Sequence, residues 1–557
     1  MRLFDRVGRA KLHATLDATG DDKSPVSAAQ LAVTGDLDDL RVDARVNVNG
    51  DWSKQSVANV RLDGTVDAPQ GRALIKFMNL DWLVAVGNGA GQLKVQAAGP
   101  LTSDMTFEAR LSADGLSAQA GGSGQLSEGE GVRAKATLRV TSADLRPILT
   151  GSAAGSSLPL QMTSRVTIAG EAMAFEDIDA KLAGSGIRGR IAVDGASPRR
   201  IDGRIESDAA DVPVLLARGI GMQPQTTAAG DAWSWSSEPF VNGLFGKFTG
   251  KVALKFARAR VLGQFAAREL NATLRFGKDE LALEDVAGTL AGGRLSGGIA
   301  FRSGENGLTT HARISLARAD VATLLSTAAR PPITGSLDLT AETEGTGLSP
   351  IALVGSLKGS GKILLSNAQI AGLDSRSFEA ITRAVDQGLP IETGRVSVLV
   401  GKSLDGGPLS LKRAESTVQI SAGQLRLSDV SAESKDAALS IAGTLDLTDG
   451  SVDARLILSG SAEAAGARPN IFVALKGPLT APARSVDVSA LTGWLTLRAV
   501  ENQTKRLRAI ENIPAQPRGR GMPNTRQAPA LPAPIDVRPA PAPRSAGQPA
   551  ASVRSQN

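Results

Sequence analysis

Apolar and polar residues alternate along most of this 557-residue chain. Within residues 42–48, Val or Ala occupies every second position, and Asp, Arg and Asn fill the positions between them. The same alternation runs through residues 132–140 and 251–256. A period of two gives a β-strand one apolar side and one polar side. The pattern therefore predicts a mainly β chain built from half-buried strands that present their polar side to water.

One segment of the pattern is repeated along the chain. It covers residues 281–325, with an acidic Glu-Asp pair in its first strand, a Gly-Gly turn and a closing Ala-Asp-Val. Asp320 in this ending is predicted to cap a short helix whose leucines pack back on the sheet. A copy lies at 173–216, and a weaker one at 425–458 lacks the Ala-Asp ending. A repeated unit is typical of a stacked, elongated architecture.

Four segments depart from the alternation. Residues 219–240 are rich in Gly, Pro, Thr and Trp and indicate a loop or a boundary. Apolar residues at helical spacing predict amphipathic helices near 375–387 and 494–510. The last residues are rich in Pro, Ala and Arg and are predicted to be disordered. The expected organisation is an N-terminal β-repeat region, a second β region that carries both helices, and a tail, over residues 1–230, 231–512 and 513–557.

Composition narrows the possible functions. Hydrophobic residues make up 42% but aromatic residues only 3%, so the apolar sides carry mostly small aliphatic residues. Cys is absent, which excludes disulfides and thiolate metal sites. The net charge is +6, and the tail from Pro514 supplies five of these charges, so the body lacks the basic patch of a nucleic-acid binder. No window resembles a membrane span or a signal peptide, so no anchor is expected.

The sequence holds no convincing catalytic set. His13 and His311 stand alone in alternating stretches and are expected to be outward strand residues. Gly184–Gly189 has the spacing of a dinucleotide fingerprint, but a strand follows it where a helix is required, so a turn is predicted. The Glu-Asp pairs recur at one position of the repeat, which favours a structural role at a turn or strand edge. We therefore expect a protein that is not an enzyme and has no metal and no cofactor.

The order of Gly and Leu residues over about 250 positions resembles the C-terminal region of AsmA-family envelope proteins. The resemblance is clearest from Ser236 to Ala490. It rests on degenerate positions in three stretches, which include Gly250, Leu254, Leu270, Leu274, Leu281, Leu283, Gly288, Leu290, Gly292, Gly293, Leu295 and Gly297, then Gly355, Leu357, Gly359, Gly361, Ile363, Leu365, Ile370 and Gly372, and finally Val418, Ile420, Gly423, Leu425, Leu427, Gly443 and Leu447.

The resemblance implies an elongated, curled antiparallel β-sheet that forms a hydrophobic groove, with a few short helices, related to TamB and other bridge-like lipid-transfer proteins. Such proteins stand in the periplasm, are normally anchored in the inner membrane, and support outer-membrane biogenesis. The expected partners are a phospholipid or other acyl lipid, the inner membrane, and the outer membrane or its assembly machinery. The candidate groove residues are Val252, Leu254, Phe256, Leu274, Phe276, Leu281, Leu283, Leu290, Leu295, Ile314, Leu316, Leu337, Leu339, Leu425, Leu427, Leu456 and Leu458.

Two functions of different classes remain open from the sequence. The first is a conduit or holder for phospholipid acyl chains between the two membranes. The second is a structural or adhesive β-solenoid or sandwich protein without lipid cargo, in which the alternating residues only fill a core. The observation that separates them is whether the apolar side chains line an unfilled groove or mesh with a second layer of protein.

Overall fold

The computed structural model describes residues 9–511, except for short gaps. The gaps are residues 22–23, 51–58, 101–102, 128–130, 148–156, 196–197, 224–234, 242, 263–264, 326–330, 435–436, 462–465 and 480. The predicted disordered tail therefore lies outside the described residues. Two compact units divide the chain, residues 1–501 and 502–557, and the fold below is that of the first unit.

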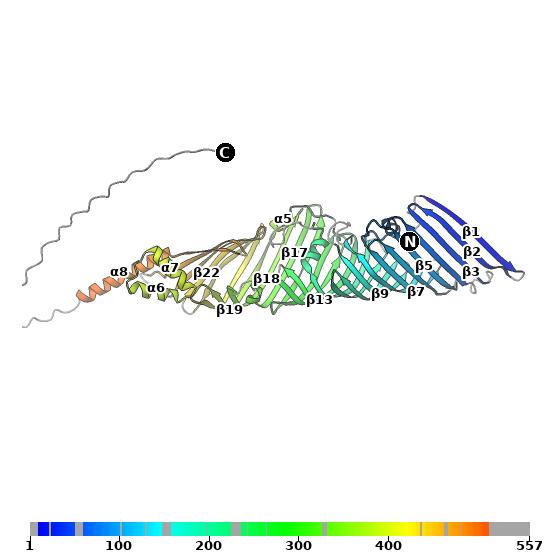
Figure 1. The fold of residues 1–557 in the computed structure, drawn as a ribbon. Helices are drawn as coiled ribbons and strands as arrows, with labels where there is room; N and C mark the ends of the chain where they lie inside the picture. The colour runs from blue at the N-terminus through cyan, green and yellow to red at the C-terminus, as the bar shows by residue number, and fades with distance from the viewer. Residues whose placement is uncertain are drawn as a thin grey trace, which may run out of the picture. The chain divides into compact units, whose positions relative to one another are not determined.

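A single sheet contains all the strands (Figure 1), and each strand pairs with the next one in chain order. Strand accounts for 63% of the structure and helix for 16%, and the sheet is long, curled and unclosed. This confirms the predicted fold class. The strands are β1 Ala10–Asp21, β2 Ser24–Leu37, β3 Leu40–Asn49, β4 Asn59–Ala68, β5 Gly91–Pro100, β6 Met105–Ala113, β7 Leu116–Ser127, β8 Gly131–Asp144, β9 Pro159–Ala169, β10 Ala172–Leu182, β11 Ser185–Asp194, β12 Arg199–Asp211, β13 Phe248–Leu262, β14 Phe265–Phe276, β15 Glu280–Leu290, β16 Gly293–Gly304, β17 Gly307–Asp320, β18 Ile333–Gly347, β19 Lys358–Ala371, β20 Pro408–Ser421, β21 Gln424–Glu433, β22 Ala437–Asp446, β23 Ser451–Gly460, β24 Asn470–Pro478 and β25 Ala483–Asp487.

Most helices are attached to one long edge of the sheet. We call this edge the helix rim; it contains the turns at 38–39, 114–115 and 291–292, and the opposite rim contains the turns at 170–171 and 422–423. Among the described helices, α5 alone follows a strand that ends at the opposite rim. The helices are α1 Gly71–Phe77, α3 Val212–Gly219, α4 Val321–Leu324, α5 Pro350–Gly355, α6 Ser377–Asp386, α7 Thr393–Leu404 and α8 Ser489–Glu511.

One pairing differs from the expected antiparallel pattern. Strands β12 and β13 are parallel, and Arg199 lies opposite Phe248. A parallel pair needs a crossover from one edge of the sheet to the other. Here the chain leaves β12 at Asp211 on the helix rim, forms α3, and returns to begin β13 at Phe248 on the opposite rim. The sheet is therefore two antiparallel meanders joined by one crossover.

The Glu-Asp pairs of the repeat form β-bulges, which agrees with the structural role expected for them. The register shifts between Phe175 and Ile178 in β10 and between Leu283 and Val286 in β15. At each bulge the Asp has a positive φ, which is 48° at Asp177 and 52° at Asp285. Asp tolerates this conformation better than most residues do. Two consecutive polar residues would otherwise reverse the alternation, so the bulge returns the next apolar residue to the same side of the sheet.

The β10 bulge and a further bulge between Leu427 and Val430 of β21 are each secured by a buried serine on the neighbouring strand. Ser164 donates its hydroxyl to the Glu176 carbonyl over 2.8 Å, and Ser416 donates to the Ser428 carbonyl over 2.9 Å. Both serines are buried, with 1% and 8% of their surfaces exposed. A bulge leaves a backbone carbonyl without its strand partner, and a buried polar group without a partner is costly. The serine hydroxyl supplies the missing donor.

We predict that Ser416→Ala lowers the free energy of unfolding by about 1–2 kcal/mol, because the Ser428 carbonyl loses its donor in a buried position. Urea unfolding measures this change. Ser410→Ala is the matched control, since Ser410 is an exposed serine of the same strand, and it is expected to leave stability nearly unchanged. Equal effects of both substitutions would show that the bulge does not depend on this hydrogen bond.

Candidate functional site

The strand registers place uncharged residues, all apolar except Thr343, in one continuous row across the sheet. Directly paired residues of neighbouring strands project to the same side, so the row can be followed from β1 to β24. None of its members is charged. We call it the central apolar row, and it consists of Leu16, Leu31, Val46, Leu62, Ala97, Phe107, Gly122, Ala136, Val166, Phe175, Ile191, Gly203, Val252, Leu274, Leu283, Ile299, Ala312, Thr343, Gly359, Ile420, Leu425, Leu445, Val452 and Gly477.

The side of the sheet that carries this row is the apolar face, and the other side is the polar face. At about 4.8 Å between neighbouring strands, the row extends for roughly 110 Å. Most of its side chains are half-buried; Val166, Val252, Leu283 and Ile420 are buried, and Leu16 is 67% exposed. Side chains meshed with a second protein layer are close-packed and mostly buried. The row is therefore an accessible apolar lining along much of its length.

All 17 candidate groove residues lie on the apolar face. This follows from the registers, since every candidate shares a row or a strand side with a member of the central apolar row. They are not equally open. Five candidates belong to none of the apolar clusters formed by the described residues: Val252, Leu283, Ile314, Leu337 and Leu425. Of these, Ile314 is 46% exposed.

The crossover covers part of the apolar face in the middle of the chain. Ile220, just beyond α3, is 4% exposed and packs with Leu281, Phe301, Leu308 and Leu353. The candidates Leu274 and Phe276 border the same cluster. A second cluster near the helix rim joins sheet residues to Val212 of α3 and Leu324 of α4. It includes the candidates Leu254, Phe256, Leu290, Leu295, Leu316 and Leu339. These side chains pack against protein: Phe256, Leu281, Leu295 and Leu316 are buried, and the others are half-buried.

At the C-terminal end, helices form a layer on the apolar face. Ile381 of α6, Val396 of α7 and Leu495 of α8 are fully or almost fully buried, and they pack in one cluster with Leu456 and Leu458. Leu427 packs at the edge of this cluster. These three candidates belong to a conventional core. Near the N-terminus, α1 likewise covers the apolar face over β2–β5, and its Leu74 is fully buried there.

The segment that follows α1 reaches from the helix rim to the opposite rim at one place. Trp82 lies just after α1, in the connection between β4 and β5 at the helix rim. Its ring nevertheless lies 6.4 Å from the ring of Phe248, at the start of β13 on the opposite rim. Arg199, also on the opposite rim, lies over the Trp82 ring at 4.6 Å from its centroid. Phe276 extends the group. This aromatic contact bridges the mouth of the curled sheet.

The polar face is held by cross-strand charge pairs. Arg275 bonds Glu284 at 2.7 Å and Glu280 at 2.8 Å, and these hydrogen bonds raise the pKa of the Arg275 guanidinium. Arg313 bonds Glu342 at 2.8 Å and lowers the pKa of that carboxyl. Opposite charges on paired strands stabilise the sheet modestly and keep this side wet. The charges leave the apolar face uninterrupted.

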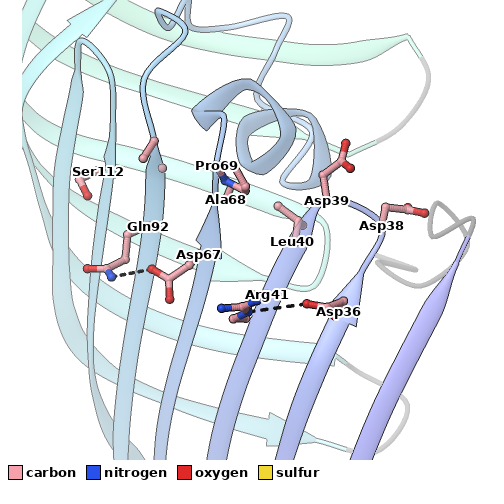
Figure 2. Close-up of a pocket in the computed structure, with 12 residues that line it drawn as sticks. Asp36, Asp38, Asp39, Leu40, Arg41, Asp67, Ala68, Pro69, Gln92 and Ser112 are labelled. Carbon is pink, nitrogen blue, oxygen red and sulfur yellow. Dashed lines mark hydrogen bonds and ion pairs between the residues drawn. The ribbon is translucent and has the colours of Figure 1, made fainter.

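Two depressions lie mainly on the polar face. The first has a volume of about 630 Å³ and contains the ion pair of Arg41 with Asp36 and the hydrogen bond from Gln92 to Asp67 (Figure 2). The second, of about 420 Å³, lies over β12–β15. Their linings mix charged, polar and small residues. Neither belongs to the central apolar row.

Two motifs raised by the sequence have structural explanations. Gly184 lies in the hairpin between β10 and β11 with a φ of 87°, so the glycine spacing there belongs to a turn, as predicted. His13 and His311 are exposed on the polar face. The ring of His311 lies 3.1 Å from the Glu342 carboxylate, within an exposed cross-strand group.

The comparison with protein families gives one match. The sequence model of the AsmA family matches residues 222–430, which begin in the crossover and end in β21. The match supports assignment of the chain to the AsmA family. No curated protein and no solved structure matched the chain. The AsmA family is associated with the cell envelope, and together with the large β-sheet the assignment indicates an envelope-associated protein. Within the described residues, no helix has the length and apolarity that a bilayer span requires.

The apolar face extends beyond the residues matched to the AsmA family and beyond the candidates chosen from the sequence. Strands β1–β12 contribute half of the central apolar row, from Leu16 to Gly203. The signal was present in the alternation at 42–48 and 132–140. Those strands lack the Gly and Leu order that carries the family resemblance, so the resemblance does not point to their apolar residues.

We predict a pH-dependent stability for the helical layer. Asp374, 5% exposed, begins the turn before α6, and its carboxylate accepts hydrogen bonds from the Arg376 side chain at 2.7–3.1 Å. These bonds hold its pKa below the usual value. The resulting stabilisation is therefore complete above about pH 4 and is lost as the pH falls through the folded-state pKa.

Asp374→Asn is expected to destabilise α6 and α7 by about 1–2 kcal/mol at neutral pH. The difference from the native chain should shrink as the pH falls toward about 3. Hydrogen exchange of the amides of α6 and α7 measures it locally. Glu379→Gln is the control, since Glu379 is an exposed α6 residue paired with Arg383. A difference that is the same at both pH values would contradict the prediction.

Proposed function

We propose that this AsmA-family protein is not an enzyme and that it holds or conducts phospholipid acyl chains along its apolar face. The observation that supports this most strongly is the central apolar row, an uncharged and largely half-buried lining that crosses 24 strands. A structural sheet has no need to keep so long an apolar surface open, because accessible apolar surface lowers solubility and stability. A lining for acyl chains requires it.

The energetics of lipid movement favour such a lining. A phospholipid with about 30 methylene groups pays roughly 25 kcal/mol to expose its chains to water, at about 0.8 kcal/mol for each group. A row of Leu, Val, Ile and Ala provides surroundings about as apolar as the bilayer interior. The lipid therefore crosses the aqueous space with a much smaller barrier and without being bound tightly.

The shape of the lining also suits acyl chains. Several positions of the row are glycines or alanines, such as Gly203, Ala312 and Gly359, and small residues leave room above the sheet. The unclosed sheet has a mouth between its rims. A head group could stay hydrated at this mouth while its chains lie on the apolar face. The Trp82–Phe248 contact would restrict the mouth at one point only.

The place of action proposed for the chain is the periplasm. The expected partners are the inner membrane, which supplies lipid, and the outer membrane or its assembly machinery, which receives it. In this role the protein supports outer-membrane biogenesis. The family assignment supports the envelope part of this proposal, and the apolar face supports the lipid part.

The alternative is a structural sheet without lipid cargo. The covered clusters around Ile220 and Leu458 favour it locally, because there the apolar face is filled by protein. Mass spectrometry of lipids that co-purify in mild conditions separates the two functions. A chain that is lipid-free in several such preparations supports the structural alternative.

We predict that lipids crosslink to one side of the strands only. A photoreactive amino acid placed at Leu16, Ile314 or Leu425, all on the apolar face, should capture phospholipid in cells. The matched controls are their chain neighbours Asp17, Arg313 and Arg426, which are exposed on the polar face. Adjacent residues of a strand project to opposite sides. Equal capture at both members of a pair would refute the proposed lipid path.

We also predict that a single charge on the apolar face blocks lipid transfer. Ile314→Asp places a carboxylate on the apolar face at a position exposed enough to keep the fold. Removing that charge from water beneath an acyl chain costs several kcal/mol, so lipid transfer between donor and acceptor vesicles should fall at least about tenfold. Thr340→Asp on the polar face of β18 is the control. Normal transfer by a folded Ile314→Asp chain would contradict a continuous path along this row.

A further inference from the structure

Helix α8 is anchored to the sheet at its beginning. Leu491, Trp494 and Leu495 are 1–4% exposed and belong to the C-terminal core cluster. The Trp494 indole donates to the Ala467 carbonyl over 3.0 Å. Arg498 then makes two hydrogen bonds to Asp386 of α6, at 2.8 and 3.0 Å. The first turns of α8 are thus fixed by packing and by a charge pair.

The rest of the same helix carries large apolar residues that the described part of the chain leaves uncovered. Leu497, Val500, Leu507 and Ile510 are 49%, 57%, 57% and 65% exposed. Their spacing of three and seven residues puts them on one side of the helix. This side is not a continuation of the buried one, because Leu491, Trp494 and Leu495 project to the other half of the helix.

The charged residues complete an amphipathic helix. From Leu497 to Arg508, every charged residue falls on the half opposite the exposed apolar residues: Arg498, Glu501, Lys505, Arg506 and Arg508. Four of these five are cations. Lys505, Arg506 and Arg508 are exposed, and in the described residues no ion pair involves them. The following sequence, from Pro514 to the end, adds six Arg against a single Asp.

We propose that the C-terminal half of α8 binds the surface of a bilayer containing anionic lipid. A helix with an apolar side and a basic side lies in the interface, with its apolar residues among the acyl chains and its cations near the head groups. Exposed apolar side chains alone would fit many partners, but the free cations beside them select a negatively charged surface. This inference does not depend on lipid carriage by the apolar face of the sheet.

The experiment uses the full-length chain and sedimentation with vesicles. One set contains phosphatidylcholine alone, and the other contains about one third phosphatidylglycerol. We expect the chain to bind the anionic vesicles more strongly and to lose this preference at about 0.5 M salt, which screens the attraction. Leu507→Ser with Ile510→Ser should reduce partitioning to the anionic vesicles at least about tenfold.

Two further variants make the result specific. Replacing Lys505, Arg506 and Arg508 by Gln should remove most of the preference for phosphatidylglycerol while the tail arginines remain. Val398→Ser is the matched control, because Val398 is a 62% exposed apolar residue of helix α7, and it should bind as the native chain does. Circular dichroism verifies that each variant keeps its helix content.

Native-like binding by the Leu507/Ile510 variant, or equal binding of the native chain to both vesicle sets, would overturn the proposal. So would the absence of any vesicle binding, which would leave a protein partner as the occupant of this surface. The outcome is independent of the lipid-crosslinking pairs. If the chain does not bind vesicles but lipid crosslinks normally at Ile314, only the proposal for α8 fails. If the chain binds vesicles but no lipid crosslinks at Ile314, only the proposal for the apolar face fails.

Discussion

Everything in this structure depends on keeping the side chains of successive strands in phase. Each hydrogen-bonded register decides which residues share a side, and a slip of one residue would turn every apolar side chain of a strand toward water. The bulges at Asp177 and Asp285 show how strictly the phase is kept. Each absorbs one extra polar residue, so Ile178 and Val286 return to the apolar face. A single uncharged row then crosses 24 paired strands.

The helices and the crossover limit how much of that face stays open. Packing against protein stabilises the sheet, because buried apolar surface is its main source of stability, but each covered residue is lost to a ligand. The covered regions lie along the helix rim, beneath the crossover and at the C-terminal end. The central row between them remains largely half-buried. The structure thus combines fully packed margins with an accessible centre.

The parallel junction of β12 and β13 divides the sheet close to the residue at which the family match begins. The match begins at residue 222, within the connection that joins the two meanders. The apolar face nevertheless passes through the junction without a break, from Gly203 to Val252. A parallel neighbour keeps paired side chains on one side as an antiparallel neighbour does. The first meander therefore shares the apolar face of the part of the chain that matches the AsmA family.

The alternation of residues by itself determined the strands, the two sides of each strand and the structural role of the Glu-Asp pairs, because these depend on neighbours in the chain. The order of Gly and Leu also carried the AsmA assignment, and helical spacing marked α6 and α8. Only the tertiary structure decided that β12 and β13 are parallel, that α7 covers the sheet, and that Leu458 is core whereas Ile314 is open. Those outcomes depend on contacts between segments far apart in sequence, such as α8 with β23. A local period of two cannot show what lies above a face.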